Sequence, residues 1–271
     1  MKNTVFEKYR DIHKNKRVFL IGNGPSLADT DLDLIKNEIS IAMNRIPLIY
    51  NKNKSWRPTY YLFSSTNVKP EKPWHLKWKS SVIEAVSEKK TTPFISETLR
   101  SHIDPRGVYN NIKWFSSMSE YKPDASGNIS EKCFSKNIID RIDKSGTTMN
   151  LALQIAYFMG FNEIVFLGAD LGWKKDLATN NDPNHFHKEY TADIPRPYKA
   201  NNQMRNIHSL AYKIFKERNK DIKFYNASLS TVLDVYPIID YKDYINNKIT
   251  YRTDVQKEAK MFWDKNHQFL M

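Results

Sequence analysis

The sequence predicts an α/β protein: a Rossmann-like parallel sheet flanked by helices, in a single domain with a lid or insertion. Short apolar, β-branched runs alternate along the 271 residues with turns and amphipathic stretches, which is the pattern of βαβ units. Four of these runs end in glycine, asparagine or hydroxyl side chains. Because ligands of parallel sheets bind outside the carboxyl ends of the strands, we expect these four ends to border one crevice.

The first part of the chain predicts three buried strands, each followed by polar residues. The loop Gly22–Leu27 comes after the first strand, and Ser26 or Asp29 is available there to cap a following helix. The second strand ends at Asn44 and the third at Ser64–Asn67. We expect these strands at 17–22, 39–43 and 59–64, and a short helix at 31–35.

Residues 69–135 are rich in proline, lysine and tryptophan, and we expect them to hold a lid or insertion. Two short apolar runs predict strands there, and a cluster of glycine, proline, aspartate and serine predicts a loop. The strands are expected at 92–96 and 112–115, and the loop at 117–130.

The pattern is clearer after Ser145. Residues 149–159 have apolar side chains at helical spacing, and Gly160 is a natural helix stop. A long segment with little periodicity, 172–200, predicts a second functional loop. We expect one domain over 1–240 and a basic tail over 241–271 with helical character at 255–262. The other elements expected are strands at 162–167 and 222–226 and a helix at 202–218.

Composition excludes several classes of protein. A hydrophobic content of 40% argues against disorder, and the apolar runs are far shorter than the roughly 20 residues of a membrane-spanning helix. The amino terminus lacks the apolar core of a signal peptide. A single cysteine, Cys133, excludes an internal disulfide and a multi-cysteine zinc site, and we expect it to be a buried apolar residue. These features predict a soluble, cytoplasmic protein.

The chain is strongly basic, with 42 Lys and Arg against 30 Asp and Glu and a net charge of +12. Such a balance favours polyanionic partners. Basic residues are concentrated between Asn44 and Lys79, interleaved with Trp56, Trp74 and Trp78. This mixture suits peripheral contact with an anionic membrane or a nucleic-acid face, although a solvated lysine-rich surface is the simplest interpretation.

Two motifs could carry chemistry. Glycines at Gly22 and Gly24 let backbone amides approach a phosphate or ribose, but the loop matches neither a Walker motif nor GxGxxG, so we expect no dinucleotide; a plain βα turn is the alternative. His185 and His187 are candidate general bases. Their i, i+2 spacing in an extended segment disfavours a shared metal ion, even with Asp170 or Asp182, and surface histidines are the alternative.

Four segments resemble the bacterial sialyltransferases of glycosyltransferase family 42 and the related domain-of-unknown-function 115 group, which includes motility accessory factors and hydroxymethylpterin pyrophosphokinase-like proteins. They are RVFLIGNGPSL from Arg17, the strand end at Asn44, the helix start at Arg141…Ser145-Gly146, and GFNEIVFLGADL. The segments 182–187 and 224–237 look most like uncharacterised members of that group. The resemblance covers roughly residues 15–240, in islands.

The resemblance implies a single nucleotide-binding domain with a lid, a CMP-linked sugar donor, no metal and no further cofactor. The base would be His187 or His185, with His187 the slightly better match. A tyrosine that holds the leaving phosphate is missing after Asp170, where Gly172 and Trp173 stand, so Tyr190 or Tyr198 would replace it. The implied donor-binding residues are Asn23, Gly24 and Ser26 for phosphate and ribose, Asn44, Ser64, Thr66 and Asn67 for the donor sugar, Ser145 and Gly146 for the phosphate or carboxylate, and Gly168 and Asp170 for cytidine and ribose.

We therefore expect an inverting, metal-independent glycosyltransferase that moves a sialic acid or another nonulosonate from CMP to a surface-glycan acceptor, as in polysaccharide biosynthesis. Arg141, Arg196 and Lys199 are candidates for stabilising the leaving phosphate. Two alternatives remain open: an ATP- and Mg²⁺-dependent pyrophosphokinase of the hydroxymethylpterin type, and a non-catalytic nucleotide- or nucleic-acid-binding protein. We expect no nucleic-acid partner, and we leave a homo-oligomer open.

Overall fold

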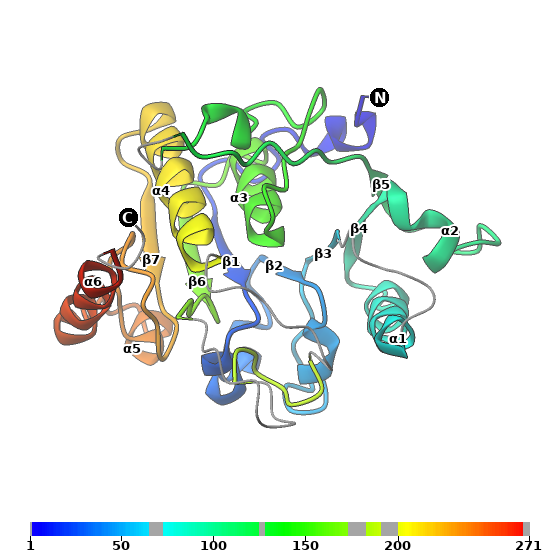
Figure 1. Cartoon of the computed structure of the whole chain (residues 1–271). Helices are drawn as coiled ribbons and strands as arrows, with labels where there is room; N and C mark the ends of the chain where they lie inside the picture. The colour runs from blue at the N-terminus through cyan, green and yellow to red at the C-terminus, as the bar shows by residue number, and fades with distance from the viewer. Residues whose placement is uncertain (1, 65–72, 125–127, 173–182, 191–199, 268–271) are drawn as a thin grey trace.

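The computed structural model describes residues 2–64, 73–124, 128–172, 183–190 and 200–267, without the side chains of 73–75, 200–201 and 266–267. The described residues form a seven-stranded sheet in the order β5-β4-β3-β2-β1-β6-β7, and all neighbouring strands are parallel (Figure 1). The predicted α/β, Rossmann-like class is confirmed. The strands are β1 Arg17–Ile21, β2 Ser40–Met43, β3 Tyr60–Phe63, β4 Thr92–Ser96, β5 Lys113–Phe115, β6 Glu163–Leu167 and β7 Lys223–Asn226.

Each strand lies where the sequence predicts one, because a parallel sheet covered on both faces leaves an unbroken apolar run as its signature. Alternate residues of β1 show how both faces are buried. Val18 and Leu20 belong to the core on one side of the sheet, and Phe19 and Ile21 belong to the core on the other. The sheet is therefore the middle layer of three.

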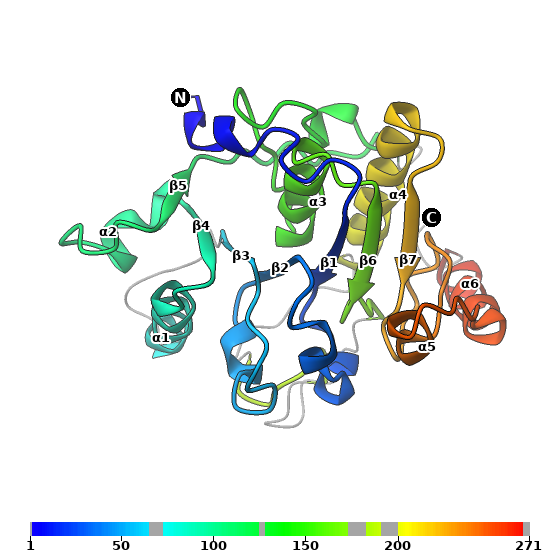
Figure 2. The same ribbon diagram turned by 180° about the vertical axis from the view of Figure 1, so that it is seen from behind.

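Helices α3 and α4 cover one face of the sheet; they lie in front of it in Figure 1 and behind it in Figure 2. The short helices that follow β1 and β2, together with α1 and α5, pack on the opposite face. The α-helices are α1 Pro73–Ser87, α2 Arg100–Ile103, α3 Thr148–Phe158, α4 Ala200–Arg218, α5 Tyr241–Ile245 and α6 Thr253–His267, and the 3₁₀ helices are η1 Thr4–Tyr9, η2 Pro25–Asp29, η3 Leu32–Ile35, η4 Ile46–Ile49, η5 Glu97–Leu99 and η6 Glu131–Cys133.

The helix α3 follows the predicted boundaries closely. Thr147 caps its start, since the side chain accepts a hydrogen bond from the Met149 amide at 3.2 Å. Gly160 ends it with φ +86°, and the amides of Gly160 and Phe161 bond back to the carbonyls of Tyr157 and Ala156. This is the Schellman arrangement, in which glycine supplies the left-handed conformation.

One helical expectation needs correction, and one helix was not predicted. The helix predicted at 31–35 is the 3₁₀ helix η3, and its cap is Asp31, which accepts from the Asp33 amide, rather than Ser26 or Asp29. A helix that was not predicted, α1, packs Trp78 and Val82 against the sheet. The strands β4 and β5, which follow it in the chain, were predicted.

The carboxyl-terminal segment, expected to be a basic tail, contributes to the body of the protein. Helix α5 buries Tyr241 and Tyr244 in the core, and α6 buries Trp263, whose indole N–H donates to the carbonyl of Val232. Both helices lie beside β7 (Figure 1). Among the described residues, no helix has the length and apolar character needed to cross a membrane.

Candidate functional site

The strand order reverses between β1 and β6, because the chain runs outward from β1 to β5 on one side and continues on the other side through β6 and β7. In open α/β sheets, ligands bind at such a reversal, outside the carboxyl ends of the strands. Here the loops after β1 and β6 meet, and the Gly24 amide donates to the Gly168 carbonyl at 2.8 Å. The candidate site is therefore centred on these two loops.

The glycines of these loops serve contact between the loops. A Cβ on Gly22 would lie 2.3 Å from the Gly168 carbonyl oxygen, and one on Gly24 would lie 2.5 Å from the Asp170 carboxylate. Gly168 itself has φ +62°. The Gly24 amide already donates to the Gly168 carbonyl, which counts against this amide, but not against Gly24 as a whole, in the predicted contact with a phosphate or ribose.

The Asp170 carboxylate binds Ser26, where the sequence predicts a phosphate of the ligand. Its carboxylate accepts hydrogen bonds from the Ser26 amide at 2.7 Å and from the Ser26 hydroxyl at 2.5 Å. Burial raises the pKa of Asp170 to about 6, against the opposing effect of the two Ser26 hydrogen bonds. A phosphate at Ser26 would compete with this carboxylate, so the structure does not support the phosphate contact expected of Ser26.

Asn23 is the residue of this loop that is best placed for a ligand. Its side chain is 9% exposed, and its Oδ1 has no hydrogen-bond partner among the residues that the structure describes. Buried polar atoms of native proteins nearly always have a partner, which can be a protein group, an ordered water or a ligand, so this oxygen is open to a donor at the edge of the sheet. The backbone carbonyl of Asn23 accepts from the Phe186 amide at 3.2 Å, which places the histidine-bearing segment 183–190 beside it.

The ends of β2 and β3 add Asn44 and Ser64. Asn44 has φ +58°, and its Oδ1 accepts from the Thr148 hydroxyl at 3.2 Å, which joins the β2 end to the start of α3. Ser64 is 4% exposed and lies 3.4 Å from Ser117, hydroxyl to hydroxyl. Thr66 and Asn67 lie outside the described residues.

The start of α3 presents a positive helix end to the same edge of the sheet. Gly146 is exposed with φ +81°, and neither its amide nor that of Thr148 has an acceptor among the described residues. Lys144, just before, is buried, and this burial lowers the pKa of its ammonium group, although Asp143 opposes the shift. Unpaired amides and a cation together favour an anion here.

The hydroxyl and the carbonyl of Ser145, by contrast, both form hydrogen bonds within the protein. Its hydroxyl donates to Asp143, and its carbonyl accepts from the side chain of Gln203 on α4. Arg141, a candidate for the leaving phosphate, pairs with Asp143 at 3.2 Å. Ser145 is completely buried, so the structure does not support the direct ligand contact expected of its hydroxyl. Arg196 and Lys199 lie outside the described residues.

The two candidate histidines have different environments. The His185 ring is 9% exposed and stacks on Tyr190 with centroids 3.9 Å apart and planes at 10°. His187 is half-buried, and its Nδ1 accepts from the Glu189 amide at 3.2 Å. A neutral imidazole that accepts at Nδ1 carries its proton on Nε2, so His187 presents a hydrogen-bond donor.

The tryptophan-rich basic stretch is not a membrane or nucleic-acid face at its described tryptophans. Trp56 is completely buried, and Trp78 is 7% exposed and packs against Phe63 and Tyr190. Arg45, which lies within this stretch, is 3% exposed. The side chain of Trp74 lies outside the described residues. Composition could not distinguish core indoles from interfacial ones.

Sequence reasoning did not single out Arg45 or Lys144 as site residues. Both follow or precede residues that it did select, Asn44 and Ser145, and both are buried cations at the ends of elements that border the edge. The signal in the sequence that could have found Arg45 and Lys144 was that each stands next to a residue already selected. A basic chain offers too many lysines and arginines for adjacency alone to identify the buried ones.

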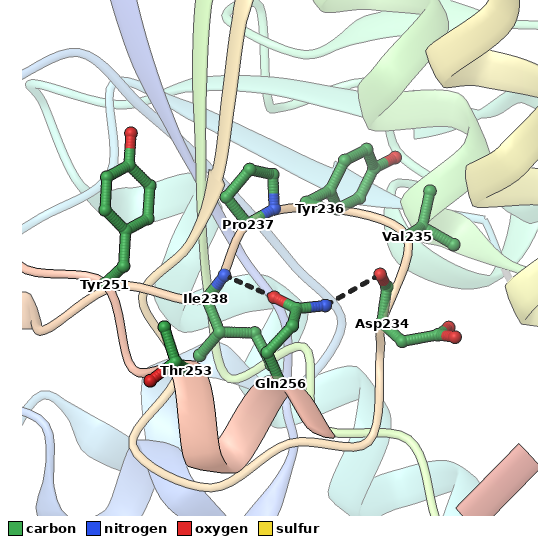
Figure 3. A pocket seen from close by; sticks show the side chains of 8 residues that line it. All are labelled: Asp234, Val235, Tyr236, Pro237, Ile238, Tyr251, Thr253 and Gln256. Atoms are coloured by element: carbon green, nitrogen blue, oxygen red, sulfur yellow. Dashed lines mark hydrogen bonds between the residues drawn. The ribbon is translucent and has the colours of Figure 1, made fainter. Parts of the chain in front are cut away.

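A pocket of about 430 Å³ lies away from this edge, between residues 234–238 and the start of α6. The side chain of Gln256 spans it: Oε1 accepts from the Ile238 amide at 2.8 Å and Nε2 donates to the Asp234 carbonyl at 3.0 Å (Figure 3). Tyr236 and Tyr251 supply much of the remaining lining. The Gln256 amide is used by the backbone, and the residues that line this pocket include none of those predicted for the strand-end site.

Comparison with known proteins identifies no family. No family model and no curated protein matches the chain. Among solved structures, the crystal structure of the Bordetella bronchiseptica enzyme WbmF in complex with NAD⁺ is similar at a TM-score of 0.22 and 10% identity. The match covers 79% of this chain and 49% of that one, so the chain spans about half its length. The likeness is too distant to bear on function. Among the described residues, no group of three or more His, Cys, Asp and Glu could hold a metal ion.

Proposed function

We propose that this protein is a glycosyltransferase that binds a CMP-linked sugar, of the sialic acid or other nonulosonate type, at the carboxyl edge of its sheet and transfers it to a glycan acceptor. The observation that carries the proposal is the buried Asn23 Oδ1 without a partner, which lies at the strand-order reversal beside the histidine-bearing segment. The motifs from Arg17 and Gly160 that resemble family 42 supply the choice of donor.

In the proposed arrangement, the two ends of the site bind different parts of the donor. Asn23 accepts a hydrogen bond from the nucleoside, from an amino or hydroxyl group. Gly146 and Thr148 direct amides toward the phosphate or the sugar carboxylate, and Lys144 adds a positive charge nearby. Asp170 shapes the nucleoside side and repels a phosphate from Ser26, so the donor has one favourable orientation.

The two histidines take different roles in the proposed displacement. A general base needs an unprotonated nitrogen directed at the acceptor hydroxyl, whereas the Glu189 amide occupies the lone pair at Nδ1 of His187. We therefore assign the base to His185, with transfer of the acceptor proton to its imidazole as the new glycosidic bond forms. His187 Nε2–H donates to the departing phosphate oxygen as the bond from the sugar to that oxygen breaks.

The pyrophosphokinase alternative needs carboxylates that can bind the Mg²⁺ ions of ATP. Two described carboxylates lie near the strand-end site, and both are bonded within the protein: Ser26 holds both oxygens of Asp170, and Asp143 accepts from Arg141, from the Ser145 hydroxyl and from the Glu120 amide. The other carboxylate considered for this role, Asp182, lies outside the described residues. The Asp170–Ser26 pair therefore favours the transferase.

The test is a thermal-shift panel of CMP, CDP, UMP, UDP, GDP, ADP and ATP, each with and without Mg²⁺. A ligand at 100 times its dissociation constant stabilises the fold by roughly 2.7 kcal/mol, so we expect CMP or CDP to raise the melting temperature without metal. The Asn23→Ala variant should lose that shift. The matched control is Asn111→Ala, an exposed asparagine near the opposite edge of the sheet, which should keep it.

Stabilisation by ATP with Mg²⁺ alone would establish the pyrophosphokinase alternative. A preference for UDP or GDP would keep a transferase but replace the donor. No response to any of the seven nucleotides would reject the proposal.

A further inference from the structure

Arg45 is a buried cation that bonds to the histidine-bearing segment. It follows Asn44 at the end of β2, and its side chain is 3% exposed. One guanidinium nitrogen, Nη1, donates to the backbone carbonyl of Tyr190 at 2.8 Å and also to that of Glu189. Nε donates to the hydroxyl of Ser81 on α1 at 3.3 Å. Among the described residues, no carboxylate lies within ion-pair distance of this guanidinium.

A charge in this position is costly unless its surroundings stabilise it. Burial lowers the pKa of Arg45, which shows that desolvation outweighs the attraction of the groups around it. Its hydrogen-bond partners are neutral oxygens, and two of them belong to the segment 183–190. Most of the compensation of this charge therefore depends on the segment staying in place.

The same segment is attached at two further points. The Phe186 amide donates to the Asn23 carbonyl at 3.2 Å, at the end of β1. Tyr190 is 1% exposed, contacts Trp78 on α1 edge to face at 5.9 Å, and supports the stacked His185 ring on its own ring. Arg45 bonds to the backbone carbonyl of Tyr190, and the His185 ring stacks on the side chain of Tyr190. Arg45 and His185 are therefore linked through Tyr190.

We propose that Arg45 is a positioning residue of the site, which fixes the segment 183–190 so that His185 lies at the ends of β1 and β2. The inference rests on the proposed function for its catalytic meaning. Arginine suits this task because its planar guanidinium directs several donors in fixed directions, so that it can bond two consecutive carbonyls and a hydroxyl on another helix at once. A lysine ammonium could reach one of these partners at a time.

The test uses the stacking of His185 on Tyr190, which shifts the imidazole proton resonances upfield. The His185 signals in a proton–carbon spectrum of the whole protein are assigned by their loss in His185→Gln. In Arg45→Gln we expect them to move toward the free-imidazole position, and in Arg45→Lys to move part of the way. The matched control is Arg57→Gln, since Arg57 also bonds backbone carbonyls but touches Glu88 and Tyr50 rather than the segment 183–190.

An unchanged His185 resonance in Arg45→Gln, or an equal shift in Arg57→Gln, would overturn the inference. If Arg45→Gln does not fold, the His185 resonance is measured in Arg45→Lys instead: a shift toward the free-imidazole position supports the inference, and an unchanged position overturns it. In turnover, Arg45→Gln should lower kcat at least tenfold while the thermal shift with CMP stays as in the wild type, whereas loss of both together would contradict positioning. Failure of the wild type in the nucleotide panel would reject the proposed function, and the resonance would still decide whether Arg45 holds the segment.

Discussion

His185 and His187 are two residues apart, yet their hydrogen bonds and burial suit them to different work. The Glu189 amide fixes the proton of a neutral His187 on Nε2, whereas the His185 ring lies flat on Tyr190. The sequence alone does not assign separate roles to two histidines in one loop. In the proposed mechanism, the direction of a single backbone amide is what assigns the donor role to His187 and the base role to His185.

The separation can be tested by the pH dependence of the transfer reaction. If His185 is the base, His185→Ala should lower kcat/KM by a hundredfold or more and remove the acidic limb of its pH profile. His187→Ala should lower kcat but keep that limb, because a lost donor changes no proton-accepting group. An acidic limb that survives in His185→Ala and vanishes in His187→Ala would reverse the assignment.

At the same scale, the sequence could predict which residues reach the edge of the sheet but not how they are used there. Asn23, Asn44 and Asp170 follow strands, and strand ends are visible in a hydrophobic pattern. The bond between Ser26 and Asp170 joins residues 144 positions apart, and Gln203 covers Ser145 from another helix. Such pairings depend on packing across the whole fold, so a local pattern holds no trace of them.

At the scale of elements, the glycine that ends α3 does more than terminate a helix. Gly160 has φ +86°, and a Cβ added there would lie 2.9 Å from the Asp11 carboxylate and 3.2 Å from two backbone carbons, those of Asp11 and Lys14. The tight approach lets the segment before β1 pack on the end of α3, where the Asp11 and His13 amides donate to the carbonyls of Phe158 and Met159. The helix stop is thus also a docking point.

We expect Gly160→Ala to lower the free energy of unfolding by more than the roughly 1–2 kcal/mol that a left-handed alanine alone costs. Gly107→Ala provides the matched comparison, since Gly107 has φ +67° and nothing lies within 4 Å of its added Cβ. Urea unfolding of both variants gives the two values. Equal losses would show that the contact with Asp11 and Lys14 relaxes without cost.

Element prediction succeeded for every strand, missed the regular helix α1, and did not recognise the short 3₁₀ helices as such. A strand buried on both faces needs only an apolar run, which the sequence shows directly. Helix α1 presents Trp78, Val82 and Val86 to the core at four-residue spacing, but the lysines and prolines around it masked this period. The helices η2 and η3 have too few residues to display any periodicity.

At the scale of the whole molecule, two buried groups give the stability of the fold opposite dependences on pH. Burial lowers the pKa of His208 to about 3, and burial raises the pKa of Asp170 to about 6. In the unfolded chain, the pKa is about 6.5 for histidine and about 3.9 for aspartate. Between pH 3 and 6.5 the unfolded state therefore takes up a proton at His208, and between about 4 and 6 the folded state retains one at Asp170.

The signs follow from this proton count. The His208 contribution is present above pH 6.5 and is lost as the pH falls toward 3. The Asp170 contribution is present below about pH 4 and is lost as the pH rises through 6. Each full proton changes the free energy of unfolding by about 1.4 kcal/mol per pH unit. Between pH 4 and 6 the two dependences largely cancel.

Single variants should remove this cancellation. We expect Asp170→Asn to lose stability steadily between pH 6 and 4 relative to the wild type, because the His208 term then acts alone. His208→Gln should instead gain stability over the same range relative to its own value at pH 7. Urea unfolding at half-unit pH steps measures both slopes, and parallel curves for the wild type and both variants would contradict the assignment.

The position of β1 between β2 and β6 also bears on how the chain is made. One edge of β1 pairs with β2 soon after synthesis, but its other edge pairs with residues Glu163–Leu167, about 150 residues later. A ribosome that adds 5–20 residues per second needs roughly 7 to 30 seconds to reach them. Throughout that interval a five-residue apolar strand exposes unpaired amides and carbonyls, which is the usual template for mispairing between chains. An interior strand of the finished sheet is thus an open edge in the nascent protein.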